Sequence, residues 1–366
     1  MDVAVSAYEF VTTGGVGRYT WEVAADLARR GHRVDVYAPG DAAPSPPGVR
    51  RRRLGPGRPP NSVVGAAELM TFGARVAPRL WCGRRRAVYG PVGAVLVPGV
   101  MTAHSVHTAW VRDRQRAGGA PPNPFDRGLM ALERVAFRLP YVRRTAVSPL
   151  CADDAAECLG VARASIVVVP PAVDAQRFAP RSTEEREAAR TSFGLRDGQF
   201  VVGVAANFAF ERKRVAALIE AAGTADGTLL VAGASDRRSS YYRQLAEQNR
   251  SDVRFLGPLG DMRAFYCALD VFALPSVNEA YGMAAHEAMA CGVATVVSDR
   301  CGIAGLLEPN VDALVVGHRH VDELVDVLER LRDDDMRRGV ARAGATWARQ
   351  RSWSDVGAGI EALLRE

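Results

Sequence analysis

The 366-residue sequence lacks the features of a membrane-embedded or a disulfide-stabilised protein. No apolar run approaches the roughly 20 residues that a membrane-spanning helix needs, and the N-terminal segment has neither the basic stretch nor the long apolar core of a signal peptide. The six cysteines are scattered and form no C-x-x-C pair, which indicates neither a zinc site nor a disulfide framework. These absences predict a cytoplasmic protein.

The sequence is also poor in motifs for metal ions and for nucleic acids. Its one Asp-x-Asp spacing, in residues 333–335, lies in a charged connection between helices, so we expect no metal ion. The net charge is +6, and arginines concentrate in residues 50–86 without a nucleic-acid-binding motif, which argues against nucleic acid as a partner. This arginine excess leaves three alternatives open: peripheral contact with the inner face of the membrane, an anionic acceptor, or a compositional bias without a partner.

What is present is a chain long enough for two domains, each with its own core. Short apolar runs alternate with amphipathic helical segments, for example a strand at residues 3–6, a helix at 16–30 and a strand at 33–37. Alternation of this kind predicts an α/β fold built on parallel sheets, in which ligands bind at the carboxyl ends of the strands. Residues 40–62 are rich in Pro, Gly and Arg, and we expect an exposed loop there.

The most informative stretch, residues 271–299, predicts a buried strand, a loop, a helix and a second buried strand. Gly282 lies where the helix begins, so the first free N–H groups, near Met283, are expected to face a phosphate or a sugar hydroxyl. Glu279 precedes this helix and Glu287 lies inside it. Eight residue steps along a helix span roughly 12 Å, whereas the paired carboxylates of a retaining glycoside hydrolase are about 5 to 5.5 Å apart. The two acids therefore suit holding two parts of one long ligand.

Three other segments end predicted strands with chemically useful residues. Gly14 and Gly15 connect a strand to a helix, as in loops that bind phosphate oxygens. His104 follows a short apolar strand and is the first candidate for a side chain that faces the ligand, with His107 as the second candidate. Lys213 lies in a basic loop after another strand, where a fixed cation could neutralise a diphosphate.

Ser276, Glu279 to Met283 and Glu287 to Gly292 together resemble the donor-binding signature of retaining glycosyltransferases of family four, which have the GT-B fold. The resemblance spans most of the chain and is strongest from residue 170 to residue 316. It implies that Glu279 contacts the transferred sugar, that Glu287 holds the ribose, and that the backbone between them meets sugar and diphosphate. These backbone positions are Ala280, Tyr281, Gly282 and Met283.

The same resemblance assigns roles outside the signature. Gly14 and Gly15 lie between the donor diphosphate and the acceptor, His104 lies near the hydroxyl groups of the transferred sugar, and Leu256 lies where the family recognises the base. Lys213 matches the lysine of the family's phosphate-binding loop. The pattern departs from the family at two positions, because Asn207 stands where many members have an arginine and Arg214 stands where they have a glycine. Arg212 or Arg177 is the candidate replacement for the arginine.

The sequence therefore predicts two Rossmann-like doubly wound domains facing a central cleft: an acceptor-binding domain (residues 1–170), a nucleotide-sugar-binding domain (171–345) and a C-terminal helix (346–366) that crosses back to the first. The expected reaction is metal-independent retaining transfer of a hexose from a nucleotide diphosphate sugar, taken as a UDP-sugar, without another cofactor. The hydroxyl acceptor is a small molecule or a lipid-linked compound. Two alternatives stay open: a nucleotide-sugar epimerase or hydrolase of the same fold, and a non-catalytic binding protein. Loops similar in make-up to the basic loop of residues 207–214 occur in lipopolysaccharide-core glucosyltransferases.

Overall fold

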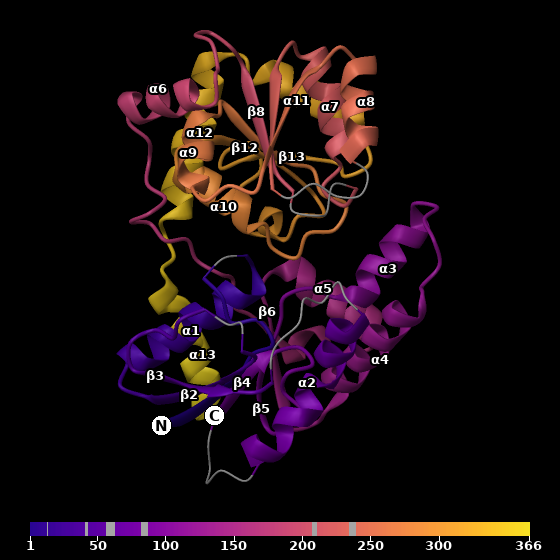
Figure 1. The fold of residues 1–366 in the computed structure, drawn as a ribbon, viewed down its shortest axis with the longest axis vertical. Coiled ribbons are helices and arrows are strands. Elements are labelled where there is room, and N and C mark those ends of the chain that lie inside the picture. Colours follow the sequence, from indigo (N-terminus) through magenta and orange to yellow (C-terminus); the bar gives the residue numbers. More distant parts are fainter. Residues whose placement is uncertain (13, 41–42, 56–62, 82–86, 207–210, 234–238) are drawn as a thin grey trace. The chain divides into compact units, whose positions relative to one another are not determined.

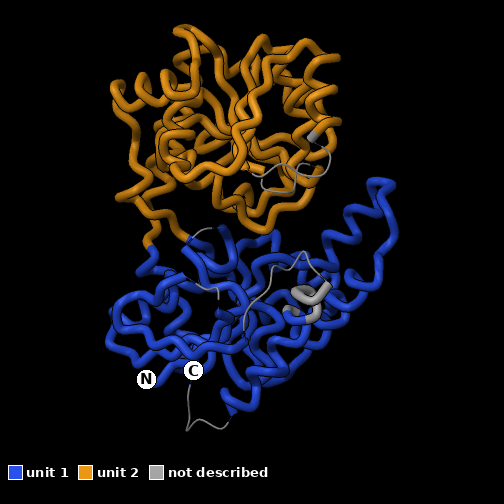
Figure 2. Tube along the Cα trace, in the orientation of Figure 1, with its two compact units in different colours: residues 1–171, 353–366 blue, residues 172–352 orange. Residues whose placement is uncertain are grey.

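A computed structural model describes residues 1–366 with the exception of 13, 41–42, 56–62, 82–86, 207–210 and 234–238 (Figure 1). The chain divides into two compact units (Figure 2). Unit 1 consists of Met1–Pro171 and Trp353–Glu366, and unit 2 of Ala172–Ser352. No helix in the described part of the chain is both long and apolar enough to cross a membrane.

The described strands of unit 1 form one parallel sheet in the order β3-β2-β1-β4-β5-β6-β7. The strands are β1 (Asp2–Ser6), β2 (Arg33–Ala38), β3 (Val49–Arg53), β4 (Ala87–Pro91), β5 (Gly99–Ala103), β6 (Val142–Ala146) and β7 (Ile166–Val168). The helices are α1 (Val16–Arg29), α2 (Val63–Trp81), α3 (His107–Arg116), α4 (Pro124–Arg138), α5 (Pro149–Leu159) and α13 (Trp353–Arg365), with a short 3-10 turn at Arg163–Ser165. Helices α1 and α13 pack against each other, and α4 contacts α2, α3 and α5 (Figure 1).

Strand β3 corrects the expectation of an exposed loop over residues 40–62, because it adds an edge strand next to β2. Four consecutive arginines, Arg50 to Arg53, hide the period-2 pattern of a strand. Two of these side chains bond within the unit. The Arg50 Nε lies 2.9 Å from the buried carboxylate of Asp35, and Arg51 donates to the carbonyl groups of Pro39 (2.7 Å) and Gly40 (2.5 Å). Part of the arginine excess therefore has an internal structural role.

The described strands of unit 2 form a second parallel sheet in the order β10-β9-β8-β11-β12-β13. They are β8 (Val201–Ala205), β9 (Thr228–Ala232), β10 (Asp252–Gly257), β11 (Val271–Leu274), β12 (Ala294–Ser298) and β13 (Leu314–Val316). The helices are α6 (Thr183–Ser192), α7 (Val215–Thr224), α8 (Ser239–Gln248), α9 (Met262–Ala268), α10 (Met283–Ala290), α11 (Val321–Arg330) and α12 (Asp334–Ala348), with a 3-10 turn at Gly302–Leu306. Figure 1 shows α7, α8 and α11 along one face of the sheet and α9, α10 and α12 along the other. Because helices cover both faces, every residue of β9, β11 and β12 is buried.

Each sheet has one position where the strand order reverses direction. In unit 1 it lies between β1 and β4, and in unit 2 between β8 and β11. Loops that leave neighbouring strands at such a point diverge to opposite faces of the sheet and leave a crevice, which is where open α/β sheets bind their ligands. The fold therefore directs attention to the loops that follow β1, β4, β8 and β11.

The predicted C-terminal helix over residues 346–366 corresponds to the end of one helix and the whole of a second. Helix α12 ends at Ala348 in unit 2, and α13 begins at Trp353 in unit 1. The indole of Trp347 donates to the carbonyl of Leu306 in unit 2 (3.1 Å), whereas the ring of Trp353 packs edge-on against Tyr19 in unit 1. Asp333, from the Asp-x-Asp spacing, caps α12 by accepting a hydrogen bond from the backbone N–H of Met336 (2.8 Å).

Candidate active site

An ion pair joins the two loops at the reversal point of unit 2. Lys213, in the loop between β8 and α7, donates from its Nζ to Oε2 of Glu279, in the loop after β11. Both side chains are mostly shielded from water, with exposed fractions of 15% and 16%. The backbone N–H of Val277 also donates to the carbonyl of Arg212 (3.0 Å), which ties the two loops together. Lys213 and Glu279 are therefore held close to each other at the carboxyl edge of the sheet.

Glu279 is an ionised carboxylate at neutral pH. Burial alone favours its protonated form, but the charges of Lys213 and Arg212 and the hydrogen bond from Lys213 outweigh burial and lower the pKa of Glu279 below 4.5. Lys213 is the only lysine among the 47 lysine and arginine residues of the chain. An ammonium is a compact point charge, whereas a guanidinium is a planar fork, so the two differ in how they bind a phosphate.

The backbone of Glu279 is anchored by the loop that follows β12. Its N–H donates to the carbonyl of Arg300 (2.9 Å), and its carbonyl accepts from the N–H of Gly302 (2.8 Å). Two residues on, the carbonyl of Tyr281 accepts from the N–H of Ile303 (2.7 Å). The loop that carries the carboxylate is thus fixed like an added strand, and its side chain is presented from a rigid support.

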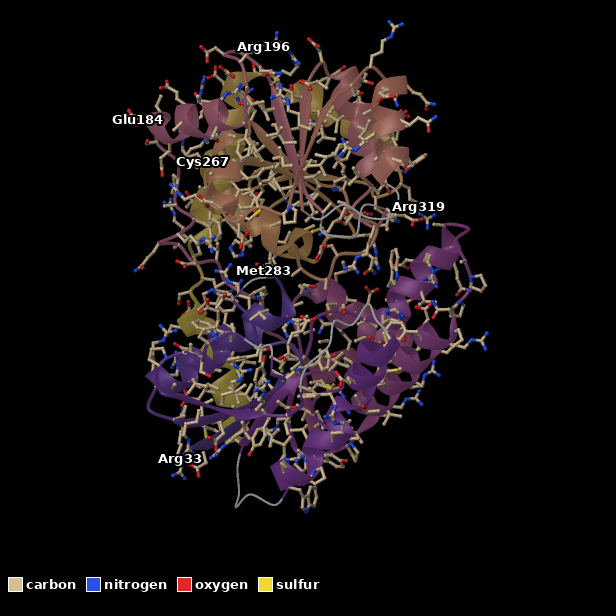
Figure 3. The ribbon with its side chains drawn as sticks, in the orientation of Figure 1. Arg33, Glu184, Arg196, Cys267, Met283 and Arg319 are labelled. Atoms are coloured by element: carbon tan, nitrogen blue, oxygen red, sulfur yellow. The ribbon has the colours of Figure 1, made fainter. Side chains whose placement is uncertain are left out.

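Helix α10 begins at Met283, directly after this loop (Figure 3). Gly282 is its N-cap, with φ of +108°, and a Cβ on this residue would lie 2.7 Å from Sγ of Cys301. Glycine is therefore required by the backbone conformation and by packing against the chain's own core, in addition to any close approach of a ligand. Gly282 supplies no side-chain cap, so the first N–H groups of α10 have no acceptor within the helix.

Glu287 lies one turn into α10. Its Oε2 accepts a hydrogen bond from the hydroxyl of Tyr266 (2.9 Å), whose side chain is fully buried. Tyr266 belongs to α9, so a neighbouring helix orients this carboxylate. Glu279, the start of α10 and Glu287 therefore all lie in one well-supported segment of unit 2.

His286 is a structural residue of this segment that no sequence motif indicated. Its Nε2 bonds to the carbonyl of Ala348 (3.0 Å), so Nε2 carries the proton and Nδ1 accepts from the hydroxyl of Tyr281 (2.9 Å). Burial lowers the pKa of His286 to about 4, so the ring is neutral at pH 7. The histidine links the signature loop to the end of α12. A histidine between two acids gave no sequence signal for this role, because its partner Ala348 lies 62 residues further along the chain.

The structure describes three of the other predicted donor contacts, Arg212, Arg177 and Leu256. The charge of Arg212 acts on Glu279, whereas the exposed guanidinium of Arg177 lies over the ring of Phe178, 5.1 Å from its centroid. Leu256 is half-buried near the carboxyl end of the edge strand β10. Asn207 lies outside the described residues. The arrangement favours Arg212 over Arg177 as the second cation, and these assignments stay predictions.

Arg214 adopts a backbone conformation that suits glycine. It has φ of +53° and is the N-cap of α7. Its Nη1 is buried without a hydrogen-bond partner in the described part of the chain, and burial lowers the pKa of the guanidinium. This position is where the family pattern has glycine, so the departure has a local energetic cost.

In unit 1, Gly14 and Gly15 are exposed at the start of α1. Gly14 has φ of +80°, Gly15 is the N-cap without a side-chain cap, and a Cβ added to either would meet no atom within 4 Å. The helix N-terminus is therefore open on this side, as the phosphate-binding interpretation requires. The assignment of these glycines to the donor diphosphate stays a prediction.

His104 follows β5 and packs edge-on against Tyr19, with ring centroids 4.8 Å apart. Its Nε2 is buried without a partner among the described residues, and burial lowers its pKa to about 3, so the ring is neutral at pH 7. His107 differs, because its Nε2 lies 2.8 Å from Oδ1 of Asp126. Of the two histidines, His104 is the one with a buried, unpartnered ring nitrogen in the described part of the chain, and its assignment to the site stays a prediction.

Comparison with known proteins follows the same division of the chain. A family model described as Glycosyltransferase Family 4 matches residues 13–177, and one described as Glycosyl transferases group 1 matches residues 199–334. A D-inositol 3-phosphate glycosyltransferase of Saccharomonospora viridis is 28% identical over 96% of this chain and 89% of its own. A GDP-mannose-dependent monoacylated alpha-(1-6)-phosphatidylinositol monomannoside mannosyltransferase of Corynebacterium glutamicum is 32% identical over 54% of this chain and 55% of its own.

Among solved structures, WaaG, a glycosyltransferase involved in lipopolysaccharide biosynthesis, aligns with a TM-score of 0.79 at 20% identity and covers 99% of both chains. This similarity shows the fold, two Rossmann-like domains of the GT-B type. The family models account for most of unit 1 and for the part of unit 2 that carries Lys213, Glu279 and Glu287. The chain therefore belongs to glycosyltransferase family 4 and is a glycosyltransferase with the GT-B fold.

Proposed function

We propose that this glycosyltransferase moves a hexose from a UDP-sugar to a hydroxyl group of a small-molecule or lipid-linked acceptor, with retention of the anomeric configuration and without a metal ion. The observation that carries the proposal is the Lys213–Glu279 pair next to the uncapped start of α10. Unit 2 binds the donor, and unit 1 binds the acceptor.

The charges of unit 2 suit a nucleotide diphosphate. The ammonium of Lys213 and the first N–H groups of α10 are fixed before the ligand arrives, so they stabilise negative charge on the departing diphosphate without reorganising. In the structure, the Glu279 carboxylate accepts a hydrogen bond from Lys213 and holds the ammonium in place. In the donor complex, the ammonium contacts phosphate oxygens, and the Glu279 carboxylate accepts hydrogen bonds from hydroxyl groups of the hexose.

Glu287 has a separate role in the proposal. A carboxylate that already accepts from Tyr266 through Oε2 keeps acceptor capacity for the two ribose hydroxyl groups. Glu279 then determines sugar transfer, and Glu287 determines nucleotide affinity.

The proposed mechanism uses no protein nucleophile. A phosphate oxygen of the leaving diphosphate accepts the proton of the acceptor hydroxyl on the face from which the diphosphate departs, so the new bond forms with retention. His104, neutral at pH 7, hydrogen-bonds to a hydroxyl of the transferred sugar. The chain's own cation and helix N-terminus provide the charge that stabilises the diphosphate.

A thermal-shift panel of UDP-glucose, UDP-galactose and GDP-mannose tests the donor, with GDP-mannose included because the Corynebacterium glutamicum relative is named for it. A donor at a hundred times its dissociation constant adds roughly 2.7 kcal/mol to the free energy of unfolding. We expect UDP-sugars to produce this effect with or without EDTA. Stabilisation by GDP-mannose alone would refute uridine as the base, and loss of turnover in EDTA would refute metal independence.

Product analysis tests the reaction. NMR of the product with an acceptor is expected to show the anomeric configuration of the donor. Conversion or hydrolysis of the nucleotide sugar as the principal reaction, with no transfer to any acceptor, would indicate an epimerase or hydrolase instead. Nucleotide binding without any turnover would indicate a non-catalytic binding protein.

A further inference from the structure

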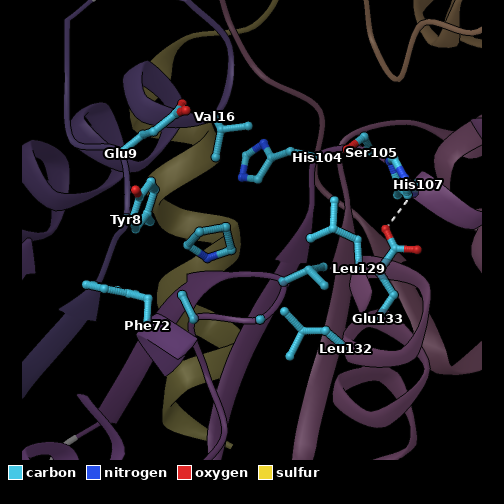
Figure 4. Close-up of a pocket in the computed structure, with 14 residues that line it drawn as sticks. Tyr8, Glu9, Val16, Phe72, His104, Ser105, His107, Leu129, Leu132 and Glu133 are labelled. Atoms are coloured by element: carbon cyan, nitrogen blue, oxygen red, sulfur yellow. Dashed lines mark hydrogen bonds between the residues drawn. The ribbon is translucent and has the colours of Figure 1, made fainter. Parts of the chain in front are cut away.

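A cavity of about 230 Å³ opens at the reversal point of the unit 1 sheet, and the described residues that line it all belong to that unit. Its walls come from the loop after β1, from the loop after β4, from His104 after β5, and from helices α2 and α4 (Figure 4). Figure 4 shows Tyr8 and Glu9 on one side and Leu129, Leu132 and Glu133 on the other. The cavity therefore occupies the position where an open α/β sheet takes up a ligand.

The charges around this cavity are acidic. The described residues that line it include the carboxylates Glu9 and Glu133 and no lysine or arginine. Leu129, Leu132 and Phe72 supply apolar surface. A wall of this kind favours one apolar face of a ligand and disfavours a phosphate, which needs cations or free N–H groups.

The helix end that could have bound a phosphate here is already occupied. Helix α3 begins at His107 beside the cavity, and its N-cap, Val106, offers no side-chain cap. Instead, Glu133 of α4 accepts the N–H of His107 at Oε1 (2.5 Å) and the N–H and hydroxyl of Thr108 at Oε2 (both 2.9 Å), the first of which is drawn in Figure 4. An anion of the protein itself thus takes the anion-binding N–H groups of α3.

The histidines add no free positive charge. His104 is neutral at pH 7 because burial lowers its pKa to about 3. His107 contacts Asp126, whose other oxygen accepts from Arg114 (2.8 Å). A phosphate ester in this cavity would therefore meet two carboxylates without a compensating cation from the described lining.

Glu9 differs from Glu133, because it has no hydrogen bond or ion pair within the described part of the chain. It is an exposed residue at the cavity rim, yet the surrounding protein raises its pKa through desolvation. A cation beside it would restore the stability of the charged form. We propose that unit 1 receives in this cavity a hydroxylated acceptor that carries an ammonium group and no phosphate.

This inference rests on the proposed function for the meaning of the bound molecule as an acceptor, but it is tested by binding alone. Three cyclitols with the same myo ring configuration form a matched series: 3-amino-3-deoxy-myo-inositol, myo-inositol and D-myo-inositol 3-phosphate. Ligand-observed NMR titration of the full chain without donor measures each affinity. We expect the amine to bind about fivefold more tightly than the neutral ring, as a partly exposed ion pair allows, and the phosphate ester to bind more weakly than both.

Two variants separate the contributions of the carboxylates. Glu9→Gln is expected to reduce the affinity for the amine to that for myo-inositol. The matched control, Glu157→Gln on the exposed surface of α5, is expected to change none of the three affinities. Glu133→Gln keeps an oxygen for the α3 N–H groups while removing the charge, and it is expected to improve binding of the phosphate ester severalfold.

The inference is wrong if the phosphate ester binds as well as the amine, if none of the three ligands binds, or if Glu9→Gln weakens all three equally. An unimproved phosphate affinity in Glu133→Gln would refute the argument from the helix end. The thermal-shift panel of nucleotide sugars measures donor binding to the same protein, independently of the acceptor titrations. Donor binding combined with a preference for the phosphate ester therefore overturns only this inference, and amine binding without donor stabilisation overturns only the proposed function.

Discussion

Replacing Lys213 by methionine is expected to reduce turnover strongly and stability moderately. Loss of one preorganised donor to a developing negative charge typically lowers kcat by about 10² to 10³, or roughly 2.7 to 4 kcal/mol in the barrier. The stability effect lies between those of exposed ion pairs, about 0 to 1 kcal/mol, and buried pairs broken on one side, about 3 to 5 kcal/mol. With side chains 15% and 16% exposed, and with Arg212 still near Glu279, we expect about 2 kcal/mol.

The pH dependence of unfolding provides a second readout of the same pair. The folded chain lowers the pKa of Glu279 below 4.5, so the unfolded chain binds more protons in this range. The contribution of the pair to stability is therefore complete above pH 4.5 and is lost as the pH falls through the folded pKa. In Lys213→Met this acid-dependent contribution is expected to shrink, which urea unfolding at pH 7 and pH 4 measures.

Initial rates of nucleotide release and calorimetric titration with the donor form the main assay. Arg338→Met, which removes an exposed cation of α12 in the same unit, is the matched control and is expected to leave kcat unchanged. Lys213→Arg keeps the charge but changes its shape, and we expect it to recover part of the lost rate. A kcat for Lys213→Met within twofold of the unsubstituted chain would refute the role of this ammonium.

Three further predictions concern the surroundings of the pair. Gly282→Ala is expected to lower the free energy of unfolding by about 3 kcal/mol, because Gly282 has a φ of +108° and an added Cβ would lie 2.7 Å from Cys301. The control Gly339→Ala, at an open position in α12, is expected to raise the free energy of unfolding by up to about 1 kcal/mol. The midpoints of urea unfolding compare the two variants. Arg214→Gly is expected to stabilise by about 1 kcal/mol, and a thermal midpoint no higher than that of Arg214→Ala would contradict the backbone argument. Glu287→Ala is expected to weaken nucleotide binding more than Glu279→Ala does, and an unchanged nucleotide titration would remove Glu287 from the ribose.

The strand–loop–helix–strand segment of residues 271–299 in unit 2 was predictable, because the apolar runs in its sequence agree with the burial of its strands in the folded chain. The apolar runs around 271–274 and 293–297 are buried on both faces of a parallel sheet, and they form β11 and β12. Gly282 marks the start of the intervening helix, as its position in the sequence indicated. The closeness of Lys213 to Glu279 followed only from the rule that parallel strands end at one edge, since 66 residues separate them.

Other features were not predictable, because they depend on partners far away in the chain. Nothing near Glu133 in the sequence indicates that it caps α3, a helix that begins 26 residues earlier. The strand β3 was missed because arginine is common in loops and the buried partner, Asp35, belongs to β2. The left-handed backbone of Arg214 runs against the residue preference on which sequence interpretation relies.

The composition of unit 1 from two separate chain segments constrains the order of events during synthesis. Helix α13 contributes Glu361, which contacts His32 (2.8 Å) and Arg30 (3.5 Å), and Gly357, whose Cα lies against Asp26 of α1 so closely that a Cβ there would be 2.0 Å from its carboxylate. The ribosome makes these residues only after all of unit 2. Unit 2 is contiguous and can fold as soon as it emerges, whereas the nascent unit 1 must keep the surface of α1 uncovered until translation reaches residues 353–366.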